Sequence, residues 1–520
     1  MATSDTPGAL EKWLITASVM LATIMEIIDT TIVTVAVPHI QGSLSAGLEE
    51  VSWVLTSYLV ANGIVIPLTG WLTSLFGRKG LLIFSVSLFT VSSFLCGSAP
   101  TLGLLVLFRI LQGIGGGPLI ATSHAVLMET FPPAQQGMAM AVYGVGLMFA
   151  PIFGPVLGGW ITDNYTWRWA FYINIPVGLL AIIMIWAFIS DPPYLRRQGR
   201  SIGNIDYIGL ILLCLGLACF QIMLDKGELE DWFASGFIVR MAMISFVALV
   251  AVVFWELRSK NPIIHLRLFK DRTYALGSIL ISIHFLALLG SVVLLPVYLQ
   301  NLMGYTPTKA GLVMGPGGIA SLVAMLFVGR LVNLIDTRIL IAFGACVTSY
   351  GLYTMSNFNL QIDFNYAMWT RLIHGFGLGF IFVPVSTTSL GRINKEEMGH
   401  ATSLYNMLRN LGGSIGVAVV TTYLSRWSQF HQSMLVSHIN PMNLEAQGRG
   451  ILLHNILGFS GPDSFTASQQ SLGMIYGEVL RQSKMLAFND NFLLLALLYL
   501  AFFPLLLLMK GGKGGRRPAH

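Results

Sequence analysis

Long apolar stretches, separated by short polar or Pro/Gly-rich segments, run along the whole chain. Each holds roughly 20 residues, which is the length that a helix needs to cross the hydrocarbon core of a membrane. Lipid offers no partners to open backbone groups, and the stretches are too apolar for the alternating strands of a barrel. The pattern predicts fourteen transmembrane helices, at about 13–37, 51–73, 80–99, 101–123, 138–161, 170–190, 206–224, 237–256, 274–299, 310–333, 338–356, 365–389, 400–424 and 488–508.

Composition narrows the class of protein further. Of the 520 residues 54% are apolar and only 10% are charged, whereas soluble domains average about 25% charged residues. A soluble enzyme, a nucleic-acid-binding domain and a disordered scaffold are therefore excluded. The four cysteines lie inside apolar stretches without metal-ligand spacing, so neither a disulfide framework nor a metal site is expected. They are Cys96, Cys214, Cys219 and Cys346.

The distribution of loop Lys and Arg predicts the orientation. If the N-terminus is cytoplasmic, most of the loop cations fall on the cytoplasmic side, as the positive-inside rule requires. Both termini are then cytoplasmic. The predicted organisation is a cytoplasmic N-terminus at 1–12, a six-helix bundle at 13–190, two inserted helices at 206–256, a second six-helix bundle at 274–508 that includes a periplasmic loop at 425–487, and a cytoplasmic tail at 509–520.

An internal repeat supports two equivalent six-helix halves. A shift of 262 residues places Arg109 on Arg371 and Gly113 on Gly375 in one helix, and Gly154 on Gly416 in the next. Because one shift fits two successive helices, the fourth and fifth spans correspond to the twelfth and thirteenth. Repeats of this kind place a substrate cavity near the bilayer midplane, between halves that move against each other.

Two carboxyl groups in the first span are candidates for proton coupling. Glu26 and Asp29 are three residues apart and therefore lie on one face of the helix. A charge at this depth costs about 2.5–3.5 kcal/mol, so such groups usually face a cavity or a partner. A buried carboxyl also binds a proton more readily than one in water. Asp29 is the stronger candidate, because Glu26 lies nearer the cytoplasmic end; a neutralised carboxylate that only packs helices is the alternative.

Arg109 is the other deep charge that needs an explanation. Its guanidinium cannot release its proton, so it can polarise a carboxyl group or clamp helices together, but it cannot carry protons. The next helix bears a stripe of small residues at four-residue spacing, interrupted by prolines that bend the helix. This stripe predicts a close helix contact and consists of Gly146, Ala150, Pro151, Gly154, Pro155, Gly158 and Gly159.

Four motifs in order resemble the major facilitator superfamily, and within it the fourteen-span drug:proton antiporters of the EmrB/QacA type. Residues 29–38 resemble the first-helix signature, 109–117 the fourth-helix motif, 144–159 the antiporter motif, and 167–178 the segment that enters the sixth helix. The resemblance covers nearly the whole chain. It implies the major facilitator fold, with two six-helix bundles and two inserted helices, and gives the stripe on the fifth helix its functional meaning.

One motif departs from the superfamily pattern. In the segment after the second helix, the usual Asp is replaced by Ser74. A latch that depends on this acid is therefore weakened or absent, and only Gly70, Gly77 and Arg78 are carried over, as a conformational hinge. Among the polar residues inside spans, those expected to line the substrate cavity are Tyr58, Asn62, His284, Tyr405 and Asn406.

The resemblance implies a proton-driven exporter of hydrophobic or amphipathic compounds in the bacterial inner membrane. No catalytic residue, metal or other cofactor is expected, and no Walker-type phosphate loop occurs in the sequence. In EmrB-like pumps a periplasmic adaptor and an outer-membrane channel complete the route, so the 425–487 loop is a candidate adaptor contact or a structural lid. The alternatives are a proton-coupled symporter for a nutrient or chelate and, from another class, a membrane-embedded enzyme acting on lipid-linked substrates.

Overall fold

The structure is a computed structural model that describes residues 8–192, 206–259, 262–439, 443–458 and 464–509. Within these residues every regular element is helical. The first half of the chain forms α1 (Ala9–Ser43), α2 (Leu48–Ser98), α3 (Leu102–Thr130), α4 (Pro133–Asn164), α5 (Trp169–Tyr172) and α6 (Asn174–Phe188).

Two helices stand between the halves, and the second half follows them. The inserted pair is α8 (Tyr207–Lys226) and α9 (Gly236–Arg258). The second half consists of α10 (Arg272–Asn301), α11 (Pro307–Leu331), α12 (Thr337–Met355), α13 (Phe364–Leu390), α14 (Met398–Ser437), α15 (Leu444–Gly458), α16 (Ser464–Leu500) and α17 (Phe502–Leu508). Short 3₁₀ turns occupy Trp232–Ala234, Leu266–Lys270 and Lys395–Glu397.

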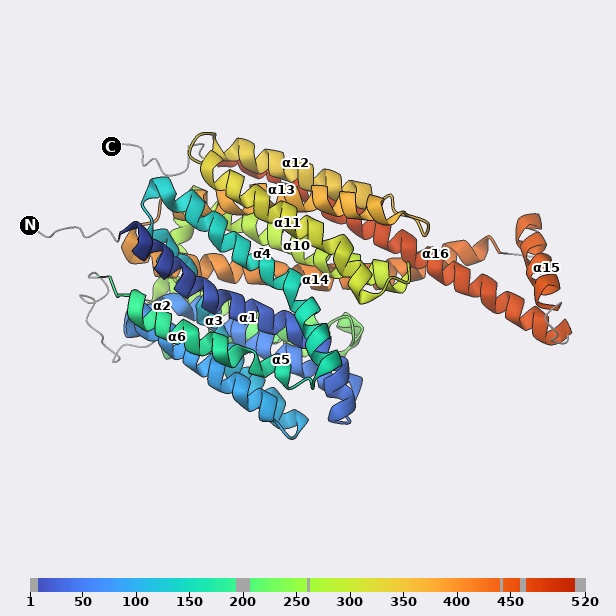
Figure 1. The fold of residues 1–520 in the computed structure, drawn as a ribbon, viewed down its shortest axis with the longest axis horizontal. Coiled ribbons are helices and arrows are strands. Elements are labelled where there is room, and N and C mark those ends of the chain that lie inside the picture. Colours follow the sequence, from blue (N-terminus) through green and yellow to red (C-terminus); the bar gives the residue numbers. More distant parts are fainter. Residues whose placement is uncertain (1–7, 193–205, 260–261, 440–442, 459–463, 510–520) are drawn as a thin grey trace, which may run out of the picture.

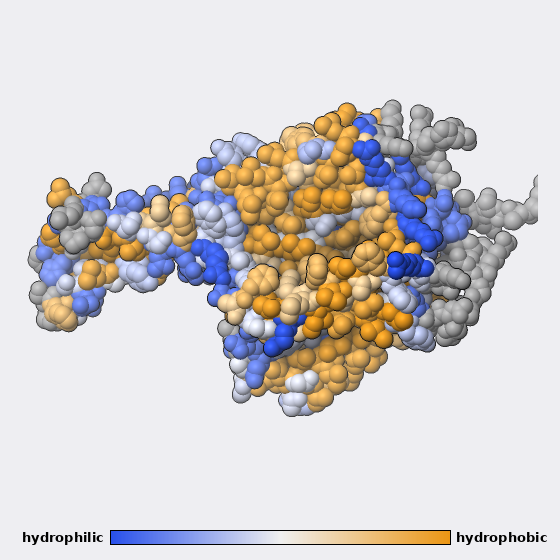
Figure 2. Space-filling view, turned by 180° about the vertical axis from the view of Figure 1, so that it is seen from behind, coloured by the Kyte–Doolittle hydropathy of each residue, from blue (hydrophilic) through white to orange (hydrophobic). Residues whose placement is uncertain are grey.

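The helices form a bundle with an apolar belt. Ten helices of the described chain are long and apolar enough to cross a membrane, and α2 contains two of the predicted spans, which meet at a break at Gly77. Figure 2 shows the belt as a band of apolar surface between hydrophilic ends. Such a band suits lipid contact because lipid solvates apolar side chains and excludes unpaired polar groups. The count of fourteen spans stays a prediction.

The two ends of the bundle differ. Helix α1 begins and the described part of the chain ends at the same end of the bundle, which we call the terminal face (Figure 1). At the opposite end α14, α15 and α16 project far beyond the other helices, and we call this projection the arm (Figure 1). The predicted 425–487 loop is therefore largely helical. Residues 464–487 of this loop belong to α16, which continues from the arm into the bundle as one helix.

The halves meet through reciprocal helix contacts. Helix α2 packs on α14, and α4 packs on α11. The 262-residue repeat relates α4 to α14. Each of these two equivalent helices packs on a helix of the opposite half, as expected for two related halves that face each other. The largest cluster of buried apolar residues continues across this interface. The interface between the halves is thus packed protein, and any polar group inside it needs an explanation.

Candidate functional site

Asp29 and Arg109 form a fully buried ion pair in the first half. Arg109 Nη1 lies 2.7 Å from Asp29 Oδ2, and neither side chain is exposed. Arg109 Nε donates to the backbone carbonyl of Val54 at 3.0 Å. The guanidinium also lies over the ring of Tyr58, 4.1 Å from its centroid. These contacts fix the cation between α1 and α2, where a lone buried charge would be strongly destabilising.

The second carboxylate oxygen of Asp29 accepts two hydrogen bonds. Asp29 Oδ1 accepts from Gln112 Nε2 at 2.9 Å and from Asn174 Nδ2 at 2.6 Å. Both amides are held in turn by Ser93, whose Oγ lies 2.6 Å and 3.2 Å from them. All three groups bonded to the carboxylate are hydrogen-bond donors, so both oxygens of Asp29 are paired.

Glu26 lies one turn earlier on α1 and has a different environment. Its Oε1 accepts from Asn62 Nδ2 at 2.8 Å. Its Oε2 is buried and has no hydrogen-bond partner, and the residue as a whole is only 3% exposed. A buried, unpaired carboxylate oxygen is costly when charged and becomes much less costly when it carries a proton. Glu26 is thus the carboxyl group of this pair that has room for a proton.

A cation of the second half faces Glu26. Arg409 on α14 is buried and interacts electrostatically with the Glu26 carboxylate across the interface. Its Nη1 has no hydrogen-bond partner. Nearby, Nδ1 of His124 on α3 lies 3.3 Å from Asn406 Nδ2 on α14. This contact connects the two halves. A carboxyl group with one unpaired oxygen and an incompletely paired cation therefore interact electrostatically across the contact between the halves.

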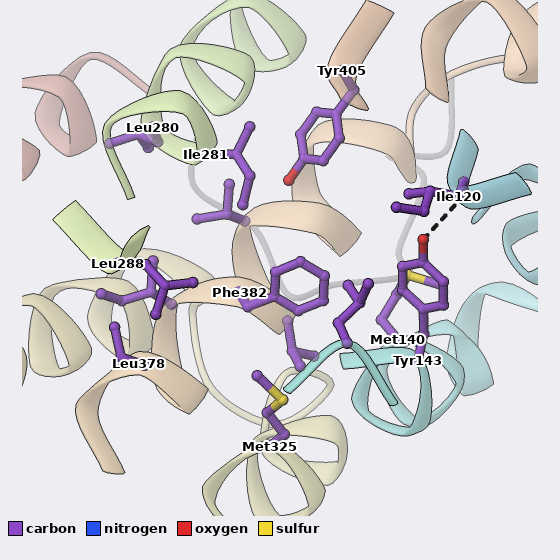
Figure 3. Packing of buried hydrophobic residues seen from close by; sticks show 14 of the residues in the cluster. Ile120, Met140, Tyr143, Leu280, Ile281, Leu288, Met325, Leu378, Phe382 and Tyr405 are labelled. Carbon is purple, nitrogen blue, oxygen red and sulfur yellow. Dashed lines mark hydrogen bonds between the residues drawn. The ribbon is translucent and has the colours of Figure 1, made fainter. Parts of the chain in front are cut away.

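Aromatic and thioether side chains surround this polar patch. Figure 3 shows Tyr143 and Met140 from the first half beside Phe382 and Met325 from the second, with Tyr143 donating to the Ile120 carbonyl. The Tyr143 and Phe382 rings are stacked at a centroid distance of 6.4 Å. Large flexible side chains of this kind adapt to apolar ligands of different shape.

The small-residue stripe on α4 packs against α1. Gly146 faces Met20 and Ile24, and Gly158 faces the backbone of Ile32, so that a side chain at either position would require α1 or its side chains to shift. Gly154 faces Thr31 in the same manner, whereas Gly159 points into open space. The side chains of Ala150, Pro151 and Pro155 lie outside the described part of α4. The stripe thus brings α4 against the helix that bears Glu26 and Asp29.

The predicted hinge contains an ion pair that the sequence did not suggest. Gly77 adopts φ +73°, a conformation that favours glycine. Arg78 forms a bidentate pair with Glu129 at the end of α3, and the two side chains are only 3% and 8% exposed. Asp191 accepts from the backbone N–H of Lys79 at 2.9 Å. Carboxylates from other segments therefore surround Arg78, although Ser74 stands where the motif usually has an acidic residue.

The same region holds the two halves together at the terminal face. Gly70 on α2 lies directly against the backbone of His400 on α14. Ser403 Oγ donates to the carbonyls of Ile66 and Pro67, at 2.6 Å and 2.8 Å. Asn333 Nδ2, just beyond α11, donates to the Ala134 carbonyl on α4 at 2.8 Å. These contacts close the bundle between the site and the terminal face.

The predicted cavity residues separate into two groups. Tyr58 and Asn62 contact Arg109 and Glu26, and Asn406 contacts His124 at the interface. Tyr405 lies 3.0 Å from Ser386 Oγ and points toward the same apolar cluster (Figure 3). His284 instead lies within the second half, 3.3 Å from Tyr499 Oη. The substrate role of all five stays a prediction.

Several residues of the site were not selected from the sequence. Gln112 and Asn174 lie inside the motifs at 109–117 and 167–178, but the motifs assign them no role. Arg409, His124, Ser93 and Glu129 are not singled out by any sequence pattern. Gln112 carried a signal, because it lies one turn after Arg109 on the same helix face and its counterpart in the repeat, His374, is also polar.

Comparison with known proteins agrees with this architecture. Residues 19–417 match the family model described as "Major Facilitator Superfamily". The chain is 39% identical over 457 residues to "Multidrug export protein EmrB" of Haemophilus influenzae, covering 88% of each chain. It is 36% identical to the Escherichia coli K12 protein of the same name and to "Fatty acid resistance protein FarB" of Neisseria gonorrhoeae, covering 98% of each chain.

Solved structures support the same fold. The proton:xylose symporter XylE superposes with a TM-score of 0.58 at 17% identity, covering 96% of this chain and 97% of that one. The human organic anion transporter MFSD10 superposes with a TM-score of 0.59 at 12% identity, over 94% and 99%. At such identities the likeness concerns the fold alone. From the family match, the full-length relatives and the apolar helices, the chain belongs to the major facilitator superfamily and is a multi-pass inner-membrane transporter, not an enzyme.

Proposed function

We propose that this transporter is a proton-driven antiporter that exports hydrophobic or amphipathic compounds. The observation that carries the proposal is the buried Glu26 carboxyl group, which has one unpaired oxygen and faces Arg409 across the interface of the halves. The full-length likeness to multidrug export proteins supports the direction of transport. The adaptable apolar surroundings in Figure 3 support the substrate class.

In the proposed cycle Glu26 exchanges the proton. Protonation removes the charge that faces Arg409, so the attraction between the halves weakens and their packing is free to change. Loss of the proton restores the attraction. Substrate and proton then compete for one state of the interface, which is the requirement for exchange of one against the other. The stripe of α4 lies against α1 and transmits the movement of α1 to the interface.

Asp29 and Arg109 have a different part in this proposal. Their ion pair, with its amide donors, supplies a fixed charge that positions α1 on α2 and α3. The sequence favoured Asp29 over Glu26 as the proton carrier, and that assignment stays a prediction. The geometry favours the opposite division of roles, and substitutions at the two carboxyl groups distinguish the two assignments.

Export is tested directly in proteoliposomes that contain the purified protein and a fluorescent amphipathic dye. When the lumen is acidified, which reproduces the outside of a cell for inverted molecules, we expect dye to accumulate in the lumen while protons leave it. A second pH dye reports the proton flux. Movement of dye and protons in the same direction would instead establish symport, and dye movement that ignores the gradient would refute proton coupling.

We also propose that the arm is a docking site for a periplasmic adaptor, which would pass substrates to an outer-membrane channel. Helices α15 and α16 pack on each other, yet large apolar side chains on the arm are exposed, with Leu444 81% and Phe465 71% exposed. The arm lies beyond the apolar belt (Figure 2), so lipid does not cover it. Exposed apolar patches on a soluble segment typically mark a protein partner. With the arm on the periplasmic side, the terminal face is cytoplasmic and the fourteen predicted spans have the expected orientation.

Charged substitutions on the arm are expected to separate export in cells from transport by the isolated protein. Ile451→Asp and Leu472→Asp replace exposed apolar side chains and should reduce drug resistance in cells roughly tenfold or more, because each buries an unpaired charge in the contact. Dye transport in proteoliposomes should stay at the wild-type level. Gln469→Asp, which replaces a polar residue on α16 near Leu472, is the matched control. Equal resistance in all variants would exclude the arm as an adaptor site.

A further inference from the structure

The second half contains a buried polar cluster that corresponds to the Asp29 site but has no acid. Arg371 and His374 lie on α13, His284 on α10 and Tyr499 on α16, and all are at least nine-tenths buried. Arg371 and His374 occupy the positions of Arg109 and Gln112 in the 262-residue repeat. Arg371 Nη1 lies 2.5 Å from His374 Nδ1. The guanidinium is therefore held by a neutral neighbour, whereas that of Arg109 is held by a carboxylate.

The missing carboxylate can be located by matching α1 with α10. Gly154 faces the Ile28 carbonyl, and its repeat partner Gly416 faces the Leu286 carbonyl. Likewise Gly158 faces Ile32, and residue 420 at the equivalent position faces Gly290. Both contacts give an offset of 258 residues between α1 and α10. With this offset, Ala287 is the counterpart of Asp29, and His284 is the counterpart of Glu26.

Ala287 is fully buried and lacks the carboxylate that pairs with the guanidinium in the first half. Among the described residues Arg371 has no ion pair with any acid. A buried guanidinium without a counter-charge costs several kcal/mol. The second half thus retains the cation of the repeated site but not its anion.

The donors around the cluster are also incompletely used. An arginine cannot accept a hydrogen bond, so His374 Nδ1 accepts from Arg371 and the ring proton of neutral His374 is on Nε2. This Nε2 has no partner, and neither has Arg371 Nε. His284 Nε2 is also unpaired, and it is a donor when Tyr499 donates its hydroxyl proton to His284 Nδ1. Buried N–H groups are normally paired, and a set that remains unpaired beside a cation indicates an absent acceptor.

We propose that this cluster binds a small monovalent inorganic anion, of the size of chloride, in the place of the missing carboxylate. The anion neutralises Arg371 and accepts from the unpaired N–H groups, so that it stabilises the second half as Asp29 stabilises the first. Chloride suits the site because it accepts hydrogen bonds from several directions and releases its water more readily than a divalent anion. The inference does not depend on the proposed direction of transport.

The test measures the melting temperature of the full-length protein in detergent, with chloride replaced by gluconate at constant ionic strength. The wild-type melting temperature should be constant at low chloride and rise linearly with log chloride above the dissociation constant, as binding to the folded state requires. Ala287→Asp supplies an internal carboxylate and should remove this dependence while making the protein in gluconate as stable as wild type in chloride. Arg371→Gln should also remove the dependence.

Two controls define the outcome. Ala287→Ser adds volume without charge and should retain the chloride dependence, as should Arg426→Gln, which removes an exposed arginine. Binding of radioactive chloride to the wild-type protein provides a readout that does not require any variant to fold. Absence of a chloride effect and of chloride binding in the wild type would overturn the proposal. An equal effect in Ala287→Asp would do so as well.

Discussion

Glu26→Gln is expected to abolish uphill transport while leaving exchange of substrate intact. A proton that crosses 100 mV contributes about 2.3 kcal/mol and one pH unit about 1.4 kcal/mol, so one proton sustains a concentration ratio of several hundredfold for a neutral substrate. Without the exchanging carboxyl group this ratio should fall to about one. Glutamine still accepts from Asn62 and is neutral like the protonated acid, so counterflow of labelled against unlabelled substrate should continue.

The measurement is steady-state dye accumulation and counterflow in the same proteoliposomes. Glu256→Gln is the matched control, since Glu256 is a buried carboxyl group on α9 that accepts from the Ile264 N–H and lies away from the interface of the halves. It should accumulate dye like the wild type. Uphill accumulation by Glu26→Gln would remove Glu26 from the proposed mechanism.

Asp29→Ala is expected to destabilise the protein more than any other single substitution proposed here. It leaves Arg109 buried without its counter-ion, and removal of one partner of a buried pair costs about 3–5 kcal/mol. Asp29→Leu combined with Arg109→Met removes both charges and should recover most of this loss, because an apolar pair of similar volume is often as stable as the ion pair it replaces. Unfolding in mixed micelles, followed by tryptophan fluorescence, measures both effects.

A different result would support the role that the sequence assigned to Asp29. If Asp29→Asn folds with wild-type stability, exchanges substrate and fails to accumulate it, Asp29 carries the proton and Glu26 does not. If Asp29→Asn is strongly destabilised, while Glu26→Gln folds normally and loses only uphill transport, the fixed-charge role of Asp29 is correct. The two carboxyl groups are thus separated by comparing stability with coupling.

The helices and the family were accessible from the sequence because membrane spans are long and local. An apolar stretch identifies its own helix, and the order of motifs identifies the fold. The structure confirmed the helical major facilitator fold, with a repeat that is visible in the reciprocal packing of α2, α4, α11 and α14. The break at Gly77 lies between two predicted spans, where the sequence placed the hinge.

The pairing of charges was not accessible in the same way. Spacing places Glu26 and Asp29 on one face of α1, but only the rotation of α1 against its neighbours decides that Asp29 meets Arg109 and Glu26 meets Asn62. The groups that interact with the two carboxyl groups come from α2, α3, α6 and α14. The same holds for Glu129, which pairs with Arg78 from a distant helix end. Such contacts are set by tertiary packing and leave no local pattern in the sequence.

The continuity of α16 has a mechanical consequence. This single helix of 37 residues extends over about 55 Å at a rise of about 1.5 Å per residue. It contains no proline, which is one of the main causes of a sharp kink in a helix. Inside the bundle it packs on α10, α12 and α14, the last of which bears Arg409. The helix therefore acts as a stiff lever, and a partner bound at its outer end is mechanically connected to the core of the bundle.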